Sequence, residues 1–176
     1  MAPILFLDID GVLCCHTSEL LDEEPIAQLR RVVDQTGAEI VLSSDWRRHP
    51  GLLAKAEAAL STIGAKLVGQ TPCRSKNQPL RPLEIMQWLA ENELAASQQW
   101  VVLDDRMLLE EVGGASLQGR FVQCDAKKGL DVHTADQLIR LLRARSRVRV
   151  WQKVSFDKAW WLGLLGALCP RGWAST

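Results

Sequence analysis

Residues 4–11 have the sequence ILFLDIDG, in which four apolar residues lead into two aspartates and a glycine. A short apolar run bounded by turn residues indicates a buried strand, and this strand would end in a tight turn at Gly11. Comparable apolar runs follow at residues 38–42, 100–103 and 121–124, with a brief one at 66–68. The sequence therefore predicts four buried strands and a short fifth one.

The segments between these runs carry apolar residues at helical spacing. Three of them hold a proline near the expected start of a helix, at Pro25, Pro50 and Pro82. A last helix is expected to open at Thr134, which forms a capping-box pattern with Gln137. Strands that alternate with helices predict an α/β fold, a Rossmann-like three-layer sandwich around a mainly parallel sheet.

Polar residues follow three of the expected strands directly: Asp8 and Asp10, then Ser43, then Asp104 and Asp105. The carboxyl ends of parallel strands share one edge of a sheet, so we expect these residues to meet there. Four carboxylates at one edge would raise one another's pKa values, and a bound cation relieves this repulsion. Oxygen ligands favour Mg²⁺, which keeps positions open for phosphate oxygens, so we predict an Mg²⁺ site and a phosphorylated substrate.

The same residues suggest a phosphoryl-transfer reaction. Asp8 stands at the strand end, where its position is most fixed, and we expect it to attack phosphorus and form an aspartyl-phosphate. Asp10 would protonate the leaving oxygen and later activate water. Ser43 would donate a hydrogen bond to a phosphoryl oxygen, and Arg81, just before Pro82, would supply positive charge.

These four segments in this order resemble the motifs of the haloacid dehalogenase-like (HAD) superfamily, over roughly residues 3–143. The sequences LSSDWR at residues 42–47 and VVLDDR at 101–106 further resemble the HAD domains associated with RNA-repair proteins. The resemblance implies that Asp8 is both nucleophile and metal ligand, and that Asp10 binds the metal through its backbone carbonyl.

For the remaining motifs, the resemblance implies that Asp104 is a metal ligand and that Asp105 binds the metal directly or through water. Most relatives carry lysine in the third motif, where this chain has Arg81. Arg74 and Lys76 are nearby alternatives for the phosphate-binding cation.

HAD enzymes often contain an inserted cap domain, and this chain has little room for one. The intervals 11–42 and 45–80 hold about one helix each, which is too little for a separate domain. We therefore expect a capless Mg²⁺-dependent phosphomonoester hydrolase that acts on a nucleic-acid end or a nucleotide. A catalytically degenerate HAD-like binding or scaffold module and a HAD phosphotransferase are the alternatives.

Two local questions stay open at this stage. Either Ser43 or Ser44 could satisfy backbone groups rather than substrate, although Ser43 follows the apolar run directly. Trp46, Arg47 and Arg48 could form a substrate-gripping loop. The alternative is a tryptophan packed on the sheet edge beside surface arginines.

The bulk composition fits one main domain, which we place at residues 1–145, followed by a tail at 146–176. Lysine plus arginine and aspartate plus glutamate both number 21, so nucleic-acid binding would need a local patch. The five cysteines are odd in number and lack metal-ligand spacing, which favours a reducing, cytoplasmic location.

An arginine run at residues 140–149 leads into the tail. Further on, the tail holds an apolar stretch at 160–169 that opens with two tryptophans. This stretch is too short for a transmembrane segment, which needs about 20 residues. We expect the tail to dock on the domain or to mediate self-association. A membrane surface or nucleic-acid phosphates are alternative contacts for it.

Overall fold

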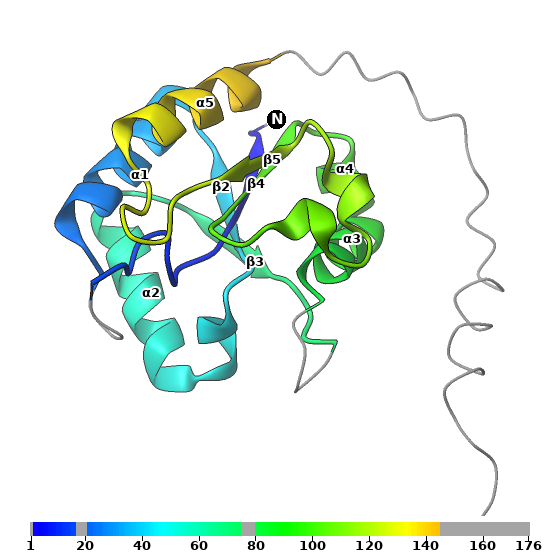
Figure 1. Cartoon of the computed structure of the whole chain (residues 1–176), viewed down its shortest axis with the longest axis horizontal. Coiled ribbons are helices and arrows are strands. Elements are labelled where there is room, and N and C mark those ends of the chain that lie inside the picture. The colour runs from blue at the N-terminus through cyan, green and yellow to red at the C-terminus, as the bar shows by residue number, and fades with distance from the viewer. Residues whose placement is uncertain (1, 17–20, 75–79, 145–176) are drawn as a thin grey trace, which may run out of the picture. The chain divides into compact units, whose positions relative to one another are not determined.

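The computed structural model describes residues 2–16, 21–74 and 80–144. Five strands form one parallel sheet in the order β3-β2-β1-β4-β5 (Figure 1). They are β1 (Ile4–Leu7), β2 (Glu39–Leu42), β3 (Leu67–Gln70), β4 (Trp100–Asp104) and β5 (Phe121–Gln123). The predicted α/β fold with a parallel central sheet is confirmed.

Helices cover both faces of this sheet. Figure 1 shows α1, α2 and α5 on one side and α3 and α4 on the other. The helices are α1 (Glu23–Thr36), α2 (Pro50–Thr62), α3 (Arg81–Glu91), α4 (Glu93–Ala96) and α5 (Val132–Arg143). Three short 3-10 turns complete the domain, namely η1 (Asp45–Arg48), η2 (Leu108–Glu110) and η3 (Gly114–Leu117).

The central strand β1 is apolar along its whole length, and both of its faces are buried. Leu5 and Leu7 belong to one core cluster, which includes residues of α1, α2 and α5. Ile4 and Phe6 belong to a second cluster, which includes residues of α3 such as Ile85. Side chains alternate between the faces of a strand, so one four-residue run supplies both cores. This arrangement confirms the expected three-layer sandwich.

Within the described residues, no inserted domain interrupts this sandwich. The interval 11–42 contributes α1 and β2, and the interval 45–80 contributes η1, α2 and β3. The capless architecture expected from the sequence is therefore present in this part of the chain. No helix among these residues is long and apolar enough to cross a membrane.

The last helix begins earlier than its sequence pattern suggests. The capping box at Thr134 predicted the wrong start, because α5 begins at Val132 and its N-cap is Asp131. The Asp131 carboxylate accepts a hydrogen bond from Thr134 N at 2.8 Å. The expectations for residues 146–176, including self-association, fall outside the described residues.

Candidate active site

The carboxyl edge of the sheet holds the backbone of the expected site residues in fixed positions. Hydrogen bonds continue past the strand ends: Asp8 N donates to Leu103 O at 3.1 Å, and Ser43 N donates to Leu7 O at 2.8 Å. Asp104 is itself the last residue of β4. The sheet therefore sets where each of these side chains starts, and only side-chain torsions remain to aim it.

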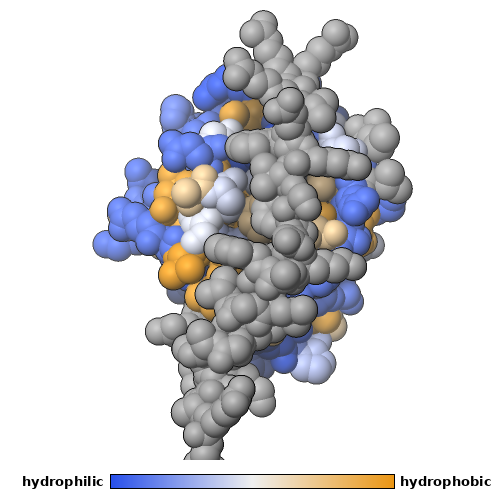
Figure 2. Space-filling view, turned by 90° about the vertical axis from the view of Figure 1, so that its right-hand side faces the viewer, coloured by the Kyte–Doolittle hydropathy of each residue, from blue (hydrophilic) through white to orange (hydrophobic). Residues whose placement is uncertain are grey.

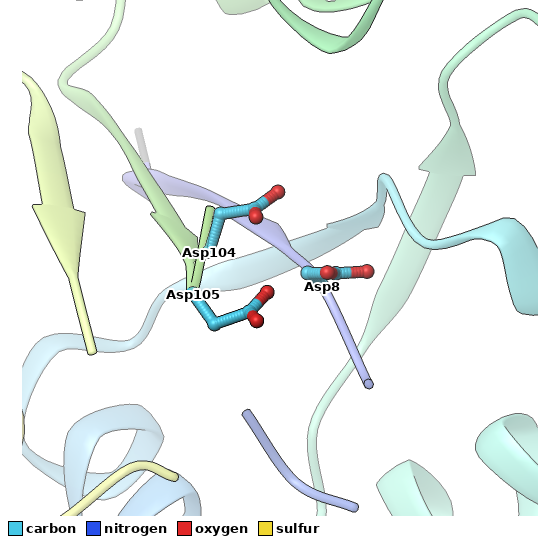
Figure 3. Close-up of side chains that lie close together, drawn as sticks. All are labelled: Asp8, Asp104 and Asp105. Atoms are coloured by element: carbon cyan, nitrogen blue, oxygen red, sulfur yellow. The ribbon is translucent and has the colours of Figure 1, made fainter. Parts of the chain in front are cut away.

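Three carboxylates gather at this edge. Asp8, Asp104 and Asp105 each offer an oxygen, and these oxygens lie within 4.8 Å of one another. Figure 3 shows Asp104 and Asp105, at the end of β4, projecting to the same side as Asp8 at the end of β1. Asp8 is 3% exposed and Asp104 is 0% exposed. One cation could contact all three acids at this separation.

Gly11 allows this close approach. Its φ of +68° lies in the left-handed region, which strains residues that have a side chain. A Cβ at this position would lie 2.6 Å from the carboxyl carbon of Asp105. Any side chain at Gly11 would therefore displace Asp105 or the turn that follows Asp8 and Asp10.

Arg81, the first residue of α3, places its guanidinium between two of the acids. Its Nη1 lies 3.1 Å from Asp8 Oδ1 and 2.7 Å from Asp104 Oδ2, and its side chain is 2% exposed. Burial lowers the pKa of Arg81, but the two carboxylates outweigh burial and raise it, so the group stays charged. Arg74, one alternative for this role, is exposed. Lys76, the other, lies outside the described residues.

Two of these acids, Asp104 and Asp105, are hard to ionise in this setting. Burial, and then the carboxylate of Asp8, raise the pKa of Asp104 to about 7, although Arg81 opposes the change. Burial and Asp8 also raise the pKa of Asp105. A cation bound among these oxygens would favour their charged forms, so metal binding and proton release should be coupled.

Several buried polar atoms at this edge have no hydrogen-bond partner within the described residues. Asp8 Oδ1 is buried and forms no hydrogen bond within the described residues, even though Arg81 lies 3.1 Å away. Ser43 Oγ and Arg81 Nε are also buried and unpaired there. Buried polar atoms usually have partners. Carboxylate oxygens suit Mg²⁺, and the hydroxyl and guanidinium could donate to phosphoryl oxygens.

The order of these residues along the chain matches a known family. Residues 4–135 match the family described as the HAD domain in Swiss Army Knife RNA repair proteins. The chain belongs to this family. No curated protein and no solved structure gives a significant match. The resemblance expected from the sequence, including its narrower RNA-repair part, is confirmed.

Asp10, the fourth acid expected at the site of this HAD domain, is not part of the group formed by the other three carboxylates. Its Oδ1 accepts a hydrogen bond from Trp46 Nε1 at 2.8 Å. Burial raises the pKa of Asp10, the Trp46 bond opposes this, and the charge of Asp8 adds to the rise. Asp10 thus sits beside the three acids with a hydrogen-bond partner of its own.

A cavity of about 530 Å³ lies at this edge of the HAD domain. Its walls include Asp8, Asp10, Asp105, Arg81 and Arg106. The expected nucleophile, acid/base and phosphate-binding cation therefore face one common space. Cys15 also lines it, and burial raises the pKa of this thiol to about 11, so the thiol is protonated near neutral pH.

The two adjacent serines after β2 have different surroundings. Ser44 Oγ accepts a hydrogen bond from Trp46 N at 3.3 Å and so caps η1. Ser43 is 0% exposed, and its hydroxyl has no partner within the described part of the chain. Ser44 is the serine that satisfies the backbone, and Ser43 is the one whose hydroxyl keeps no partner there, although Ser43 is not among the residues that line the cavity.

Neither of the two interpretations offered for residues 46–48, a substrate-gripping loop or a packed tryptophan beside surface arginines, describes Arg47 correctly. Trp46 is packed in the core, as one alternative expected, but Arg47 is not a surface arginine, because its side chain is 2% exposed. The Arg47 guanidinium donates to the carbonyl oxygens of Thr71 and Pro72 at 2.9 and 3.3 Å. It also donates to the backbone carbonyl of Ser44. These bonds hold the Arg47 guanidinium inside the protein rather than in an open substrate-gripping loop.

Sequence reasoning missed the acid that pairs with Arg47. Glu84 is 0% exposed, and its Oε2 accepts a hydrogen bond from Arg47 Nη2 at 2.7 Å. Its Oε1 accepts from Arg74 N at 2.9 Å. Glu84 lies one helical turn after Arg81 on α3, so the pair ties the arginine-bearing helix to the turn after β2. The signal for Glu84 was its position among apolar residues of α3.

Proposed function

We propose that this HAD domain is an Mg²⁺-dependent phosphomonoester hydrolase that works through an aspartyl-phosphate on Asp8. The proposal rests chiefly on one observation: three carboxylates from two strands have oxygens within 4.8 Å of one another, beside a buried arginine. A cluster of buried carboxylates with only a structural role would lower the stability of the sheet edge, because burial removes the hydration of each charge. A phosphoryl-transfer centre needs this combination of acids and a cation.

The first chemical step belongs to Asp8. One of its carboxylate oxygens forms a bond to phosphorus, and the bond from phosphorus to the leaving oxygen breaks. Asp10 gives its proton to that leaving oxygen. The hydroxyl of Ser43 and the guanidinium of Arg81 donate hydrogen bonds to the phosphoryl oxygens as their charge is redistributed.

The second step returns the protein to its starting state. Asp10, now a carboxylate, takes a proton from water as the water oxygen bonds to phosphorus. The bond between phosphorus and Asp8 breaks, so inorganic phosphate leaves and Asp10 is protonated again.

Mg²⁺ would be held by the carboxylates of Asp8, Asp104 and Asp105 and by the backbone carbonyl of Asp10. Its contribution when bound is to neutralise phosphoryl charge and to orient the phosphate. The donor set consists of oxygens alone, which favours Mg²⁺ over zinc.

The favoured substrate is a phosphorylated nucleic-acid end or a nucleotide. Support comes from the family, whose description names RNA repair proteins. Within residues 2–16, 21–74 and 80–144, no cap domain restricts access to the cavity edge, so a polymer end could enter. A cytoplasmic location would suit this role and the cysteines of the described residues, which form no disulfide.

The test is phosphate release by purified protein from p-nitrophenyl phosphate, nucleotides, and oligonucleotides with a 3′- or 5′-phosphate. We expect release with Mg²⁺ and none with EDTA. Asp8→Asn should lose at least about 10³-fold in kcat, because the nucleophile is gone. Asp34→Asn is the matched control, since Asp34 is an exposed acid of α1.

The outcomes separate the competing functions. Activity that survives EDTA or Asp8→Asn would refute this mechanism. Transfer of the phosphoryl group to an added alcohol, in preference to water, would favour a phosphotransferase. Intact protein with no turnover on any of these substrates would favour a binding or scaffold module.

A further inference from the structure

Trp46 is held rigidly at the end of β2. Its side chain is 2% exposed and belongs to the core cluster that also contains Leu42, Ala56 and Leu60. Its backbone N is bound by Ser44 Oγ at 3.3 Å, and Arg47, the next residue, is fixed by hydrogen bonds to two further segments. The indole ring therefore has little freedom to move.

The indole N–H of Trp46 donates its hydrogen bond to an exposed side chain. Asp10 is an exposed residue, and its Oδ1 accepts from Trp46 Nε1 at 2.8 Å. Asp10 also lines the cavity beside Asp8. A general acid must stand within hydrogen-bond reach of the leaving oxygen, which a freely rotating carboxyl does only part of the time.

We propose that Trp46 is a positioning residue that aims Asp10 into the cavity. This inference rests on the proposed function, in which Asp10 protonates the leaving oxygen. The indole N–H donates to Oδ1 and so restrains the rotation of the Asp10 carboxyl group. A tryptophan anchored in the core thus fixes the direction of the carboxyl group.

The substitution Trp46→Phe tests this role, because it keeps an aromatic ring in the core and removes the N–H. Two substrates are compared by kcat/KM, which reports the step in which the leaving group departs. An alkyl phosphate needs a proton on its leaving oxygen, whereas p-nitrophenol leaves readily as an anion. We expect a loss of about 10- to 100-fold for the alkyl phosphate and less than about threefold for the aryl phosphate.

A matched control is Trp88→Phe, a buried tryptophan on the opposite face of the sheet, where it packs against Phe6. It should leave the ratio of the two kcat/KM values unchanged. In an Asp10→Ala background, Trp46→Phe should have no further effect on that ratio, because Trp46 acts only through Asp10.

A second measurement does not require Trp46→Phe to fold. Asp10→Ala changes an exposed residue, and it should shift the Trp46 indole N–H signal upfield in the NMR spectrum of the metal-free protein. Equal losses on both substrates in Trp46→Phe, or an unmoved indole signal in Asp10→Ala, would overturn the inference. Neither result would touch the proposed function, which stands if wild type hydrolyses either ester and Asp8→Asn does not.

Discussion

Arg81 Nη1 lies 2.7 Å from Asp104 Oδ2, and both side chains are buried at the carboxyl edge of the sheet. The arginine comes from the start of α3 and the aspartate from the end of β4. This ion pair joins the two residues that the sequence predicts for the third and fourth HAD motifs. Arg81 also opposes the rise in the pKa of Asp104 that burial causes.

Replacing Arg81 should lower kcat more than replacing Arg74, the other candidate for the phosphate-binding cation. Arg81→Met removes the buried donor to phosphoryl oxygens, so kcat should fall by about 10²- to 10³-fold. Arg81→Lys keeps the charge and should recover part of this loss. Arg74→Met, at an exposed position, should change kcat by less than about threefold. The reverse order in steady-state assays would move the phosphate-binding role to Arg74.

Stability of the metal-free domain should fall as pH rises. The pKa of Asp104 is about 7 in the folded state, above its ordinary value of 3.8, so the folded protein binds the extra proton. That contribution is complete below the ordinary pKa and is lost as pH rises through about 7. The melting temperature in EDTA should therefore be lower at pH 8 than at pH 6. Asp104→Asn should flatten this dependence.

Mg²⁺ should reverse the trend, because it binds the charged carboxylates. At 100 times its dissociation constant, a ligand specific to the folded state adds about 2.7 kcal/mol to stability. The rise in melting temperature on adding Mg²⁺ should be larger at pH 8 than at pH 6. An equal rise at both values would speak against proton release from the acid cluster.

The buried pair of Arg47 and Glu84 should contribute to stability as a unit. Glu84→Gln leaves the Arg47 charge buried without its counter-ion, and we expect a loss of about 3–5 kcal/mol in the free energy of unfolding. The double change Arg47→Met with Glu84→Leu should recover part of that loss, since it removes both charges. Denaturant melts of wild type and of these two variants measure this, and a double variant no more stable than Glu84→Gln would contradict it.

A nucleic-acid end should contact the lysines beside the cavity. Ala126 lines the cavity, and the exposed Lys127 and Lys128 follow it in a turn held by Gly129 N donating to Asp125 O at 2.8 Å. Changing both lysines to serine should raise KM for a phosphorylated oligonucleotide about tenfold and lower its salt dependence. KM for a mononucleotide should stay within about twofold.

The control for this prediction is Lys66→Ser. Lys66 is exposed and pairs with Glu39 at the start of β2, at the opposite edge of the parallel sheet. It should leave both KM values unchanged. If the variant with both lysines changed has the wild-type KM for the oligonucleotide, this turn is not part of the substrate surface.

The strands and the meeting of their acids were predictable because they depend on local apolar runs and on one rule of parallel sheets. Ile4 to Leu7 must be buried on both faces, and Asp8 must then stand at the shared edge. The sequence could distinguish the role of Ser43 from that of Ser44 only in part, because the hydrogen-bond partner of a hydroxyl here depends on how η1 folds.

What the sequence could not reveal are contacts made by residues far apart in the chain. Glu84 stands among apolar residues of α3, but its partner Arg47 comes from another segment, so the sequence did not reveal the pair. The bond from Trp46 to Asp10 joins two loops in the same way. The start of α5 was misjudged because Asp131 competed as a cap with the pattern at Thr134.

The account depends most on acids from separate strands binding one cation. Titration calorimetry of Mg²⁺ into the metal-free protein tests this directly at pH 8, with Asp8→Asn and Asp104→Asn as variants and the exposed Asp34→Asn as control. We predict one Mg²⁺ site in wild type and in the control, weakened by at least about tenfold in each of the two variants. Mg²⁺ affinity equal to that of wild type in Asp8→Asn and Asp104→Asn, with both variants folded, would contradict the account.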